Sequence, residues 1–151
     1  MSFFNRLKGA AQSLAGDLQK AGKQFMNREF AEGSMAACAL IAAADGKIDP
    51  SERSKTAQFI MSNSMLQSFD VATLKQKFDF YCGKLEQDFD FGKIEAIQAV
   101  SKLKSKPDAA RAAVQVAVVI ANADGNFDEH ERRVLKEICN AVAIDPAEFG
   151  A

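Results

Sequence analysis

Two short acidic stretches contain the side chains best suited to chemistry in this sequence. Each places three carboxylates within eight residues around an Asp-Gly turn: Asp45, Asp49 and Glu52 in the first, and Asp124, Asp128 and Glu131 in the second. Hard cations prefer such oxygens, and Ca²⁺ accepts about six to eight of them in flexible geometry. We therefore expect these residues to bind a divalent cation, with Ca²⁺ favoured and Mn²⁺ or Mg²⁺ as alternatives.

Asn126 and Lys47 distinguish the two stretches. Asn126 adds an amide oxygen to the second stretch, whereas Lys47 occupies the matching place in the first. An amide oxygen is a suitable ligand, but an ammonium group repels a cation. We expect the second stretch to bind better.

The two stretches belong to an internal repeat. When each residue is aligned with the one 79 positions later, residues 41–53 match residues 120–132 at 8 of 13 positions. Each copy has an apolar segment, an Ala-Asp-Gly turn and an Asp-x-x-Glu-Arg segment. This pattern predicts two helical hairpins related by a pseudo-twofold axis.

Helix capping explains part of the repeat without any ligand. Asp49 and Asp128 are placed to cap the second helix of each hairpin, and the glutamates three residues later resemble a capping box. The two glycines of the turns suit the left-handed conformation at a helix end. Asp45 and Asp124 are left unexplained, because a carboxylate is disfavoured at a helix C-terminus.

The second stretch imitates an EF-hand only in part. Asp124, Asn126 and Asp128 match the first three ligand positions of that loop. However, the required glycine would fall on Glu129 and the bidentate glutamate on Leu135. The sequence therefore excludes an EF-hand.

Helical spacing of apolar residues places these stretches in an all-α fold, a compact bundle of about seven helices. The expected helices span residues 34–44, 50–63, 71–86, 91–104, 108–122, 129–142 and 146–149. Asp70, Asp90 and Pro107 are the expected start signals of three of them. The repeat copies span about 34–63 and 113–142, within a domain of residues 31–151.

Residues 1–30 form a separate basic segment with a net charge of +3. Its apolar residues recur at helical spacing, and we expect a partly ordered amphipathic arm. It either packs loosely on the domain or binds a membrane surface or a partner. The residues expected to make that contact are Phe3, Phe4, Arg6, Leu7 and Lys8.

Composition narrows the protein class. The chain has 151 residues, 48% of them hydrophobic, and a formal net charge of −1, which argues for one globular domain and against nucleic-acid binding. Its longest uncharged runs, 33–44 and 112–123, are too short to span a bilayer and are expected to be buried helices. Three cysteines without a Cys-x-x-Cys pair favour the cytoplasm.

No sequence signature indicates an enzyme. The chain lacks P-loop, Rossmann, His-Glu-x-x-His and Gly-x-Ser-x-Gly patterns. The single histidine, His130, is expected to be exposed, and Cys38, Cys82 and Cys139 are expected to be buried and inert. No organic cofactor is expected.

Over nearly its full length, the chain resembles the TerB family of tellurite-resistance proteins. The resemblance rests on the paired Ala-Asp-Gly-x-x-Asp-x-x-Glu motifs, the apolar helices before them and the Ser-Phe-Phe-Asn-Arg-Leu-Lys opening. It implies a cytoplasmic, all-helical domain that binds metal through the six carboxylates. It also implies association with other tellurium-resistance proteins and with the membrane protein TerC, at the inner face of the cytoplasmic membrane. Lys47 departs from the pattern.

Two main hypotheses about function remain. The first is a non-enzymatic tellurite-resistance protein that binds a divalent cation and docks on a membrane partner such as TerC. The second is a structural helical adaptor whose acidic turns only cap helices and attract a basic partner. A lesser hypothesis makes the basic arm a lipid-surface helix.

Overall fold

A computed structural model describes residues 20, 23–63, 66–122 and 127–149. The described part includes six α-helices and two short 3₁₀-helices with defined bounds, joined by turns. The helices are α3 (Arg28–Ala42), α4 (Pro50–Ser62), α5 (Val71–Gln87), α6 (Phe89–Ser101), η2 (Lys102–Ser105), α7 (Pro107–Ala121), α8 (Glu129–Ala141) and η3 (Pro146–Phe149).

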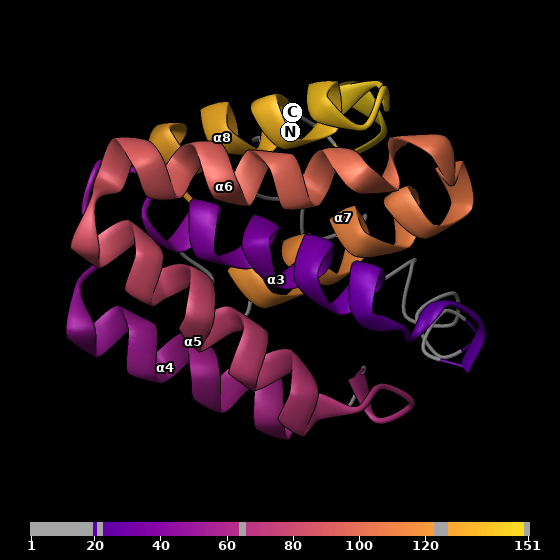
Figure 1. Cartoon of the computed structure of the whole chain (residues 1–151), viewed down its shortest axis with the longest axis horizontal. Coiled ribbons are helices and arrows are strands. Elements are labelled where there is room, and N and C mark those ends of the chain that lie inside the picture. The colour runs from indigo at the N-terminus through magenta and orange to yellow at the C-terminus, as the bar shows by residue number, and fades with distance from the viewer. Residues whose placement is uncertain (1–19, 21–22, 64–65, 123–126, 150–151) are drawn as a thin grey trace.

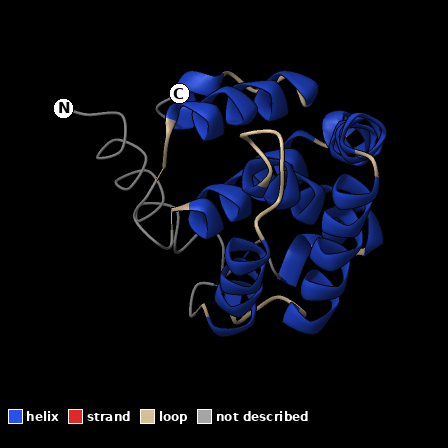
Figure 2. Ribbon diagram, turned by 90° about the vertical axis from the view of Figure 1, so that its left-hand side faces the viewer, coloured by secondary structure: helices blue, strands red, loops and turns tan. Residues whose placement is uncertain are grey.

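The predicted all-α bundle is confirmed for the described residues, which include no strand (Figure 2). Helix α3 runs through the middle of the molecule, and its most extensive contacts are with α7, α5 and α6. Figure 1 shows α6 and α8 on one side of α3, α5 and α4 on the other, and α7 behind. One central helix therefore connects the two halves of the bundle.

The helix boundaries follow the sequence repeat. Helix α7 begins at Pro107, 79 residues after α3 begins at Arg28, and α8 begins at Glu129, 79 residues after α4 begins at Pro50. The ends of these helices show the same offset. Each sequence copy thus forms a helix, a turn and a second helix of the same lengths.

Most of each uncharged run is buried, as expected. Residues 33–41 of α3 and 112–120 of α7 are all buried. Small side chains allow close packing: a Cβ atom added to Gly33 would lie 2.5 Å from Leu103 Cδ1. The first helix of each copy therefore contributes to a shared core.

Helix α3 begins at Arg28, six residues before the predicted start, so that prediction is wrong. The Asn27 side chain caps the helix by accepting a hydrogen bond from the Phe30 amide at 2.9 Å. Phe30 is fully buried and stacks on Phe69, with 5.6 Å between ring centroids. The last residues assigned to the basic arm therefore belong to α3.

Most of the predicted start signals are confirmed. Asp70 accepts a hydrogen bond from the Thr73 amide at 3.2 Å, and Pro107 occupies the first turn of α7. The prediction for Asp90 is wrong, because Asp88 caps α6 by accepting from the Phe91 amide at 3.1 Å. Asp88 is the one extended residue between α5 and α6, and an N-cap requires that extended backbone.

Candidate functional site

The candidate site is a cavity of about 100 Å³ between α3, α4 and α7, at the start of α8. Its lining includes residues from the C-terminal ends of α3 and α7, such as Ile41 and Ile120. Four carboxylates from both repeat copies line it: Asp45, Glu52, Asp128 and Glu131. Packing of α3 on α7 thus brings the two acidic turns to one cavity.

Asp45 lies in the turn that follows α3. Its Oδ1 accepts a hydrogen bond from the Lys47 amide at 3.4 Å, and its side chain is exposed at the cavity. The next residue, Gly46, has φ of 97°, a conformation that favours glycine, and its amide donates to the Ala43 carbonyl at 2.9 Å. Gly46 therefore adopts the predicted left-handed conformation.

Asp49 and Glu52 have different roles at the start of α4. Asp49 Oδ1 accepts hydrogen bonds from the amides of Ser51 at 2.8 Å and Glu52 at 3.3 Å, so its predicted capping role is confirmed. Asp49 is not among the residues that line the cavity, whereas the Glu52 side chain is. Within the described residues, the Glu52 carboxylate accepts no hydrogen bond.

Asp128 and Glu131 form the predicted capping box at the start of α8. Asp128 Oδ1 accepts from the Glu131 amide at 2.9 Å, and Glu131 Oε1 accepts from the Asp128 amide at 3.2 Å. Both side chains also line the cavity. The other predicted ligands of this turn, Asp124 and Asn126, lie outside the described residues, as does Gly125.

The lining of the cavity carries more negative than positive charge. Its charged side chains are the four carboxylates and the ammonium group of Lys55, one turn after Glu52 on α4. Lys55 forms no ion pair with any carboxylate of the described residues. Carboxylates gathered in one cavity repel each other, and a cation relieves that repulsion.

The donor set fits a hard cation only in part. Carboxylate oxygens are the right ligand type, but no three His, Cys, Asp or Glu side chains of the described residues are grouped closely enough to hold a metal ion. At the end of α7, outside the residues that line the cavity, the buried Asn122 Oδ1 has no hydrogen-bond partner among the described residues. Asn122 is not among the predicted site residues. The sequence offers one signal for it: the matching residue of the first copy is Ala43, so a polar side chain replaces an apolar one at this position of the repeat.

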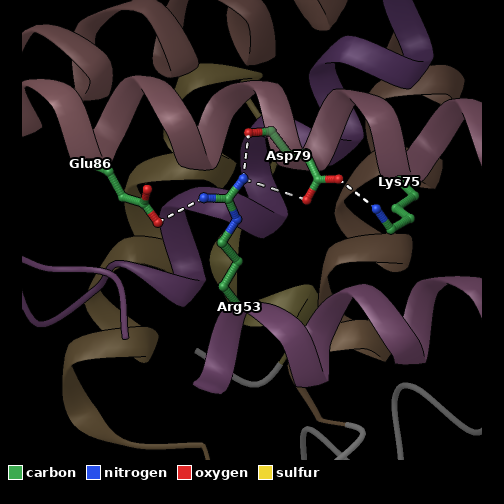
Figure 3. Close-up of polar contacts among 4 residues, drawn as sticks. All are labelled: Arg53, Lys75, Asp79 and Glu86. Carbon is green, nitrogen blue, oxygen red and sulfur yellow. Dashed lines mark hydrogen bonds and ion pairs between the residues drawn. The ribbon is translucent and has the colours of Figure 1, made fainter. Parts of the chain in front are cut away.

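Arg53, which ends the first copy of the motif, anchors the acidic start of α4 to α5 (Figure 3). Its Nη1 lies 2.8 Å from Glu86 Oε1, and its Nη2 donates to the Asp79 carbonyl at 3.2 Å and lies 3.7 Å from Asp79 Oδ1. Lys75 Nζ pairs with the same Asp79 carboxylate at 2.7 Å. Arg53 therefore holds in place the helix turn that carries Glu52.

The three cysteines are buried and form no disulfide, as expected. Burial raises the pKa of Cys82 and of Cys139 to about 12, and it raises the pKa of Cys38 further. Cys38 lines the cavity with only 3% of its surface exposed. These thiols are therefore un-ionised and poorly nucleophilic at neutral pH.

Two other predictions concern the surface. His130 is exposed in the first turn of α8, as expected. The predicted contact residues of the arm, Phe3, Phe4, Arg6, Leu7 and Lys8, lie outside the described residues. In the described part, every helix is too short or too polar to cross a membrane.

Comparisons with known proteins agree with the sequence motifs. The family model described as "Tellurite resistance protein TerB" matches residues 31–151. The chain is also 32% identical over 118 residues to "Tellurium resistance protein TerB" of Alcaligenes sp, an alignment that covers 78% of this chain and 97% of that protein. No solved structure matches the chain. The chain belongs to the TerB family.

Proposed function

We propose that this protein contributes to tellurite resistance as a non-enzymatic module that binds a divalent cation. The observation that carries the proposal is the cavity of about 100 Å³ lined by carboxylates from both repeat copies. The name of the Alcaligenes relative supports the role in resistance. Ca²⁺ is the favoured cation because the donors are oxygens, and Mn²⁺ and Mg²⁺ are the alternatives.

Residues of both turns would supply the ligands. Asp45 and Glu52 from the first turn and Asp128 and Glu131 from the second line the cavity. Asp124 and Asn126 would complete the set, whereas Asp49 serves mainly as a helix cap. A bound cation would supply positive charge that offsets the repulsion among the carboxylates and would join the two repeat copies.

The same acidic lining argues against direct capture of tellurite. Tellurite is an oxyanion, and the cavity presents four carboxylates against one ammonium group. The thiols are buried, so reduction of tellurite by a cysteine is disfavoured as well. The contribution to resistance would then be indirect, through a partner.

We place that partner at the inner face of the cytoplasmic membrane and propose that it is TerC, together with other tellurium-resistance proteins. The basic segment of residues 1–30 supports this placement, because its net charge of +3 favours an anionic surface. Binding to vesicles that contain TerC, compared with vesicles that lack it, tests the idea. Substitution of Phe3 and Leu7 by serine should weaken binding, and equal binding to both vesicle types would exclude TerC.

A structural adaptor is the second candidate function, and one observation favours it. Asp49, Asp128 and Glu131 all form capping hydrogen bonds, which give them a role without any cation. In that case the acidic turns would serve only to start helices and attract a basic partner.

Calorimetric titration separates the two candidates. The metal-free protein is titrated with Ca²⁺, Mn²⁺ and Mg²⁺ beside the double variant Asp45→Asn/Asp124→Asn, which changes neither N-cap. The matched control is Asp145→Asn, an exposed turn aspartate outside the cavity. Saturable binding that only the double variant loses supports the cation module. The absence of heat and of any thermal shift with every cation would leave the adaptor.

A further inference from the structure

Helices α5 and α6 form an antiparallel hairpin whose outer face carries large apolar side chains. Only one residue separates them, and a Cβ atom added to Gly92 would lie 2.7 Å from the Lys84 carbonyl oxygen. Phe80 is 52% exposed, Phe91 64% and Ile94 55%. The other exposed large apolar residue of the described part, Met61, lies on α4. Exposed apolar residues thus concentrate on this hairpin.

These side chains share one surface. Lys84 Nζ lies 5.5 Å from the centroid of the Phe80 ring and 3.8 Å from Glu95 Oε2 on α6. Phe91 and Ile94 are one turn apart on α6, next to Glu95 in the helix. We call Phe80, Lys84, Phe91, Ile94 and Glu95 the hairpin face. Figure 1 shows α5 and α6 on the near side of α3, with no further labelled helix in front of them.

The charges along α6 have opposite signs at its two ends. Asp90 is exposed in the first turn of α6, and Lys102 and Lys104 are exposed just after its last residue. Asp90, Lys102 and Lys104 form no ion pair in the described part of the chain. Two α6 helices packed antiparallel would bring the acidic end of each against the basic end of the other, about 18 Å along the helix.

We propose that the hairpin face binds the same face of a second copy of this chain across a twofold axis. A twofold interface joins identical patches, so it requires a self-complementary surface. The hairpin face and the two ends of α6 meet this condition. Phe80, Phe91 and Ile94 are exposed, and the charges of Asp90 at one end of α6 and of Lys102 and Lys104 at the other match only when the copy is reversed. An anionic bilayer needs a surface of uniformly positive charge, whereas this surface has carboxylates, Asp90 and Glu95, as well as lysines, and Lys84 is paired with Glu95.

The oligomeric state of the full chain tests the proposal. Light scattering and sedimentation are measured over a wide range of protein concentration, with EDTA present so that cation binding plays no part. We expect a species of twice the 16.4 kDa chain mass. The variant Phe91→Ser/Ile94→Ser should raise the dissociation constant about tenfold or more. Met61→Ser, an exposed apolar residue on α4, is the matched control and should leave the dimer unchanged.

A charge reversal gives a second, independent test. Asp90→Lys alone should weaken the dimer, because it places a lysine opposite Lys102 of the second copy. Adding Lys102→Asp should restore the affinity, because opposite charges then face each other again across the twofold axis. Circular dichroism checks that each variant retains its helices. A chain that remains a monomer at the highest concentration overturns the proposal and assigns the face to another protein or to lipid. A dimer that survives Phe91→Ser/Ile94→Ser, or that Met61→Ser dissociates, also overturns it.

Discussion

Glu52 and Glu131 occupy equivalent positions of the repeat and line the same cavity, yet only Glu131 completes a capping box. The Glu131 carboxylate accepts a hydrogen bond from the Asp128 amide, whereas the Glu52 carboxylate accepts none within the described residues. Both glutamates therefore add negative charge to the cavity, but only Glu131 also stabilises the start of its helix.

This difference predicts unequal effects on stability. Glu131→Ala should lower the free energy of unfolding by about 0.5–1 kcal/mol because it removes half of the capping box. Glu52→Ala should leave stability nearly unchanged, since its side chain makes no such bond. Urea denaturation measures both variants, with Glu131→Gln as a control that keeps the acceptor oxygen. Equal losses for the two alanine variants would contradict this assignment.

Lys55 should weaken cation binding at the cavity. It is the one ammonium group in the lining, and a positive charge repels a divalent cation. Lys55→Gln should therefore raise the affinity for Ca²⁺ roughly three- to tenfold at low ionic strength. Titration calorimetry measures this change, and Lys104→Gln, an exposed lysine outside the cavity, is the control. Equal affinities of the wild type and Lys55→Gln would show that Lys55 has no such effect.

Two described residues, Gly46 and Ala143, have positive φ, and we expect substitutions at them to change the free energy of unfolding in opposite directions. Gly46 has φ of 97° and an added Cβ atom would meet open space, so Gly46→Ala should cost about 1 kcal/mol through backbone strain alone. Ala143, just after α8, has φ of 60°, and Ala143→Gly should stabilise the protein by about 0.5–1 kcal/mol. Thermal and urea unfolding measure both, and shifts of the same sign would refute the argument.

Gly92 keeps α5 and α6 close together. An added Cβ would lie 2.7 Å from the Lys84 carbonyl oxygen and 2.8 Å from the Leu85 amide nitrogen, and these backbone atoms cannot move aside cheaply. Gly92→Ala should therefore destabilise the fold by about 1–3 kcal/mol. At Gly83, inside α5, an added Cβ would lie within 4 Å of no other part of the described structure beyond its own helix backbone and chain neighbours, so Gly83→Ala should stabilise by about 0.5–1 kcal/mol. Denaturant midpoints that fall for both variants would contradict the packing argument.

The buried thiols should resist modification in the folded state. Burial raises the pKa of Cys82 and Cys139 to about 12, so almost no thiolate is present at neutral pH. We expect Ellman's reagent to react at the rate of protein unfolding and the reaction to speed up sharply in urea. A fast phase in native protein that disappears in Cys38→Ser would instead assign an accessible thiol to the cavity.

Much of the fold could be predicted from the sequence, because capping is local chemistry. Asp49, Asp70 and Asp128 each bond amides within three residues, and Pro107 starts a helix through its own ring. The repeat likewise indicated two similar hairpins, since the same local pattern occurs twice. The start of α3 differs from the prediction even though its cap, Asn27, is also local; the burial of Phe30 against Phe69, which joins residues far apart in the chain, is the part that the sequence does not show.

The candidate site shows what local sequence leaves open. The types and spacing of the acidic residues predict a cation site, which stays a prediction, and the repeat is compatible both with two separate sites and with one shared site. Packing of α3 on α7 decides that Asp45 and Glu52 line the same cavity as Asp128 and Glu131, while Asp49 caps α4 outside it. Residue spacing determines where a helix begins, whereas the meeting of two helices depends on apolar burial summed over the whole core.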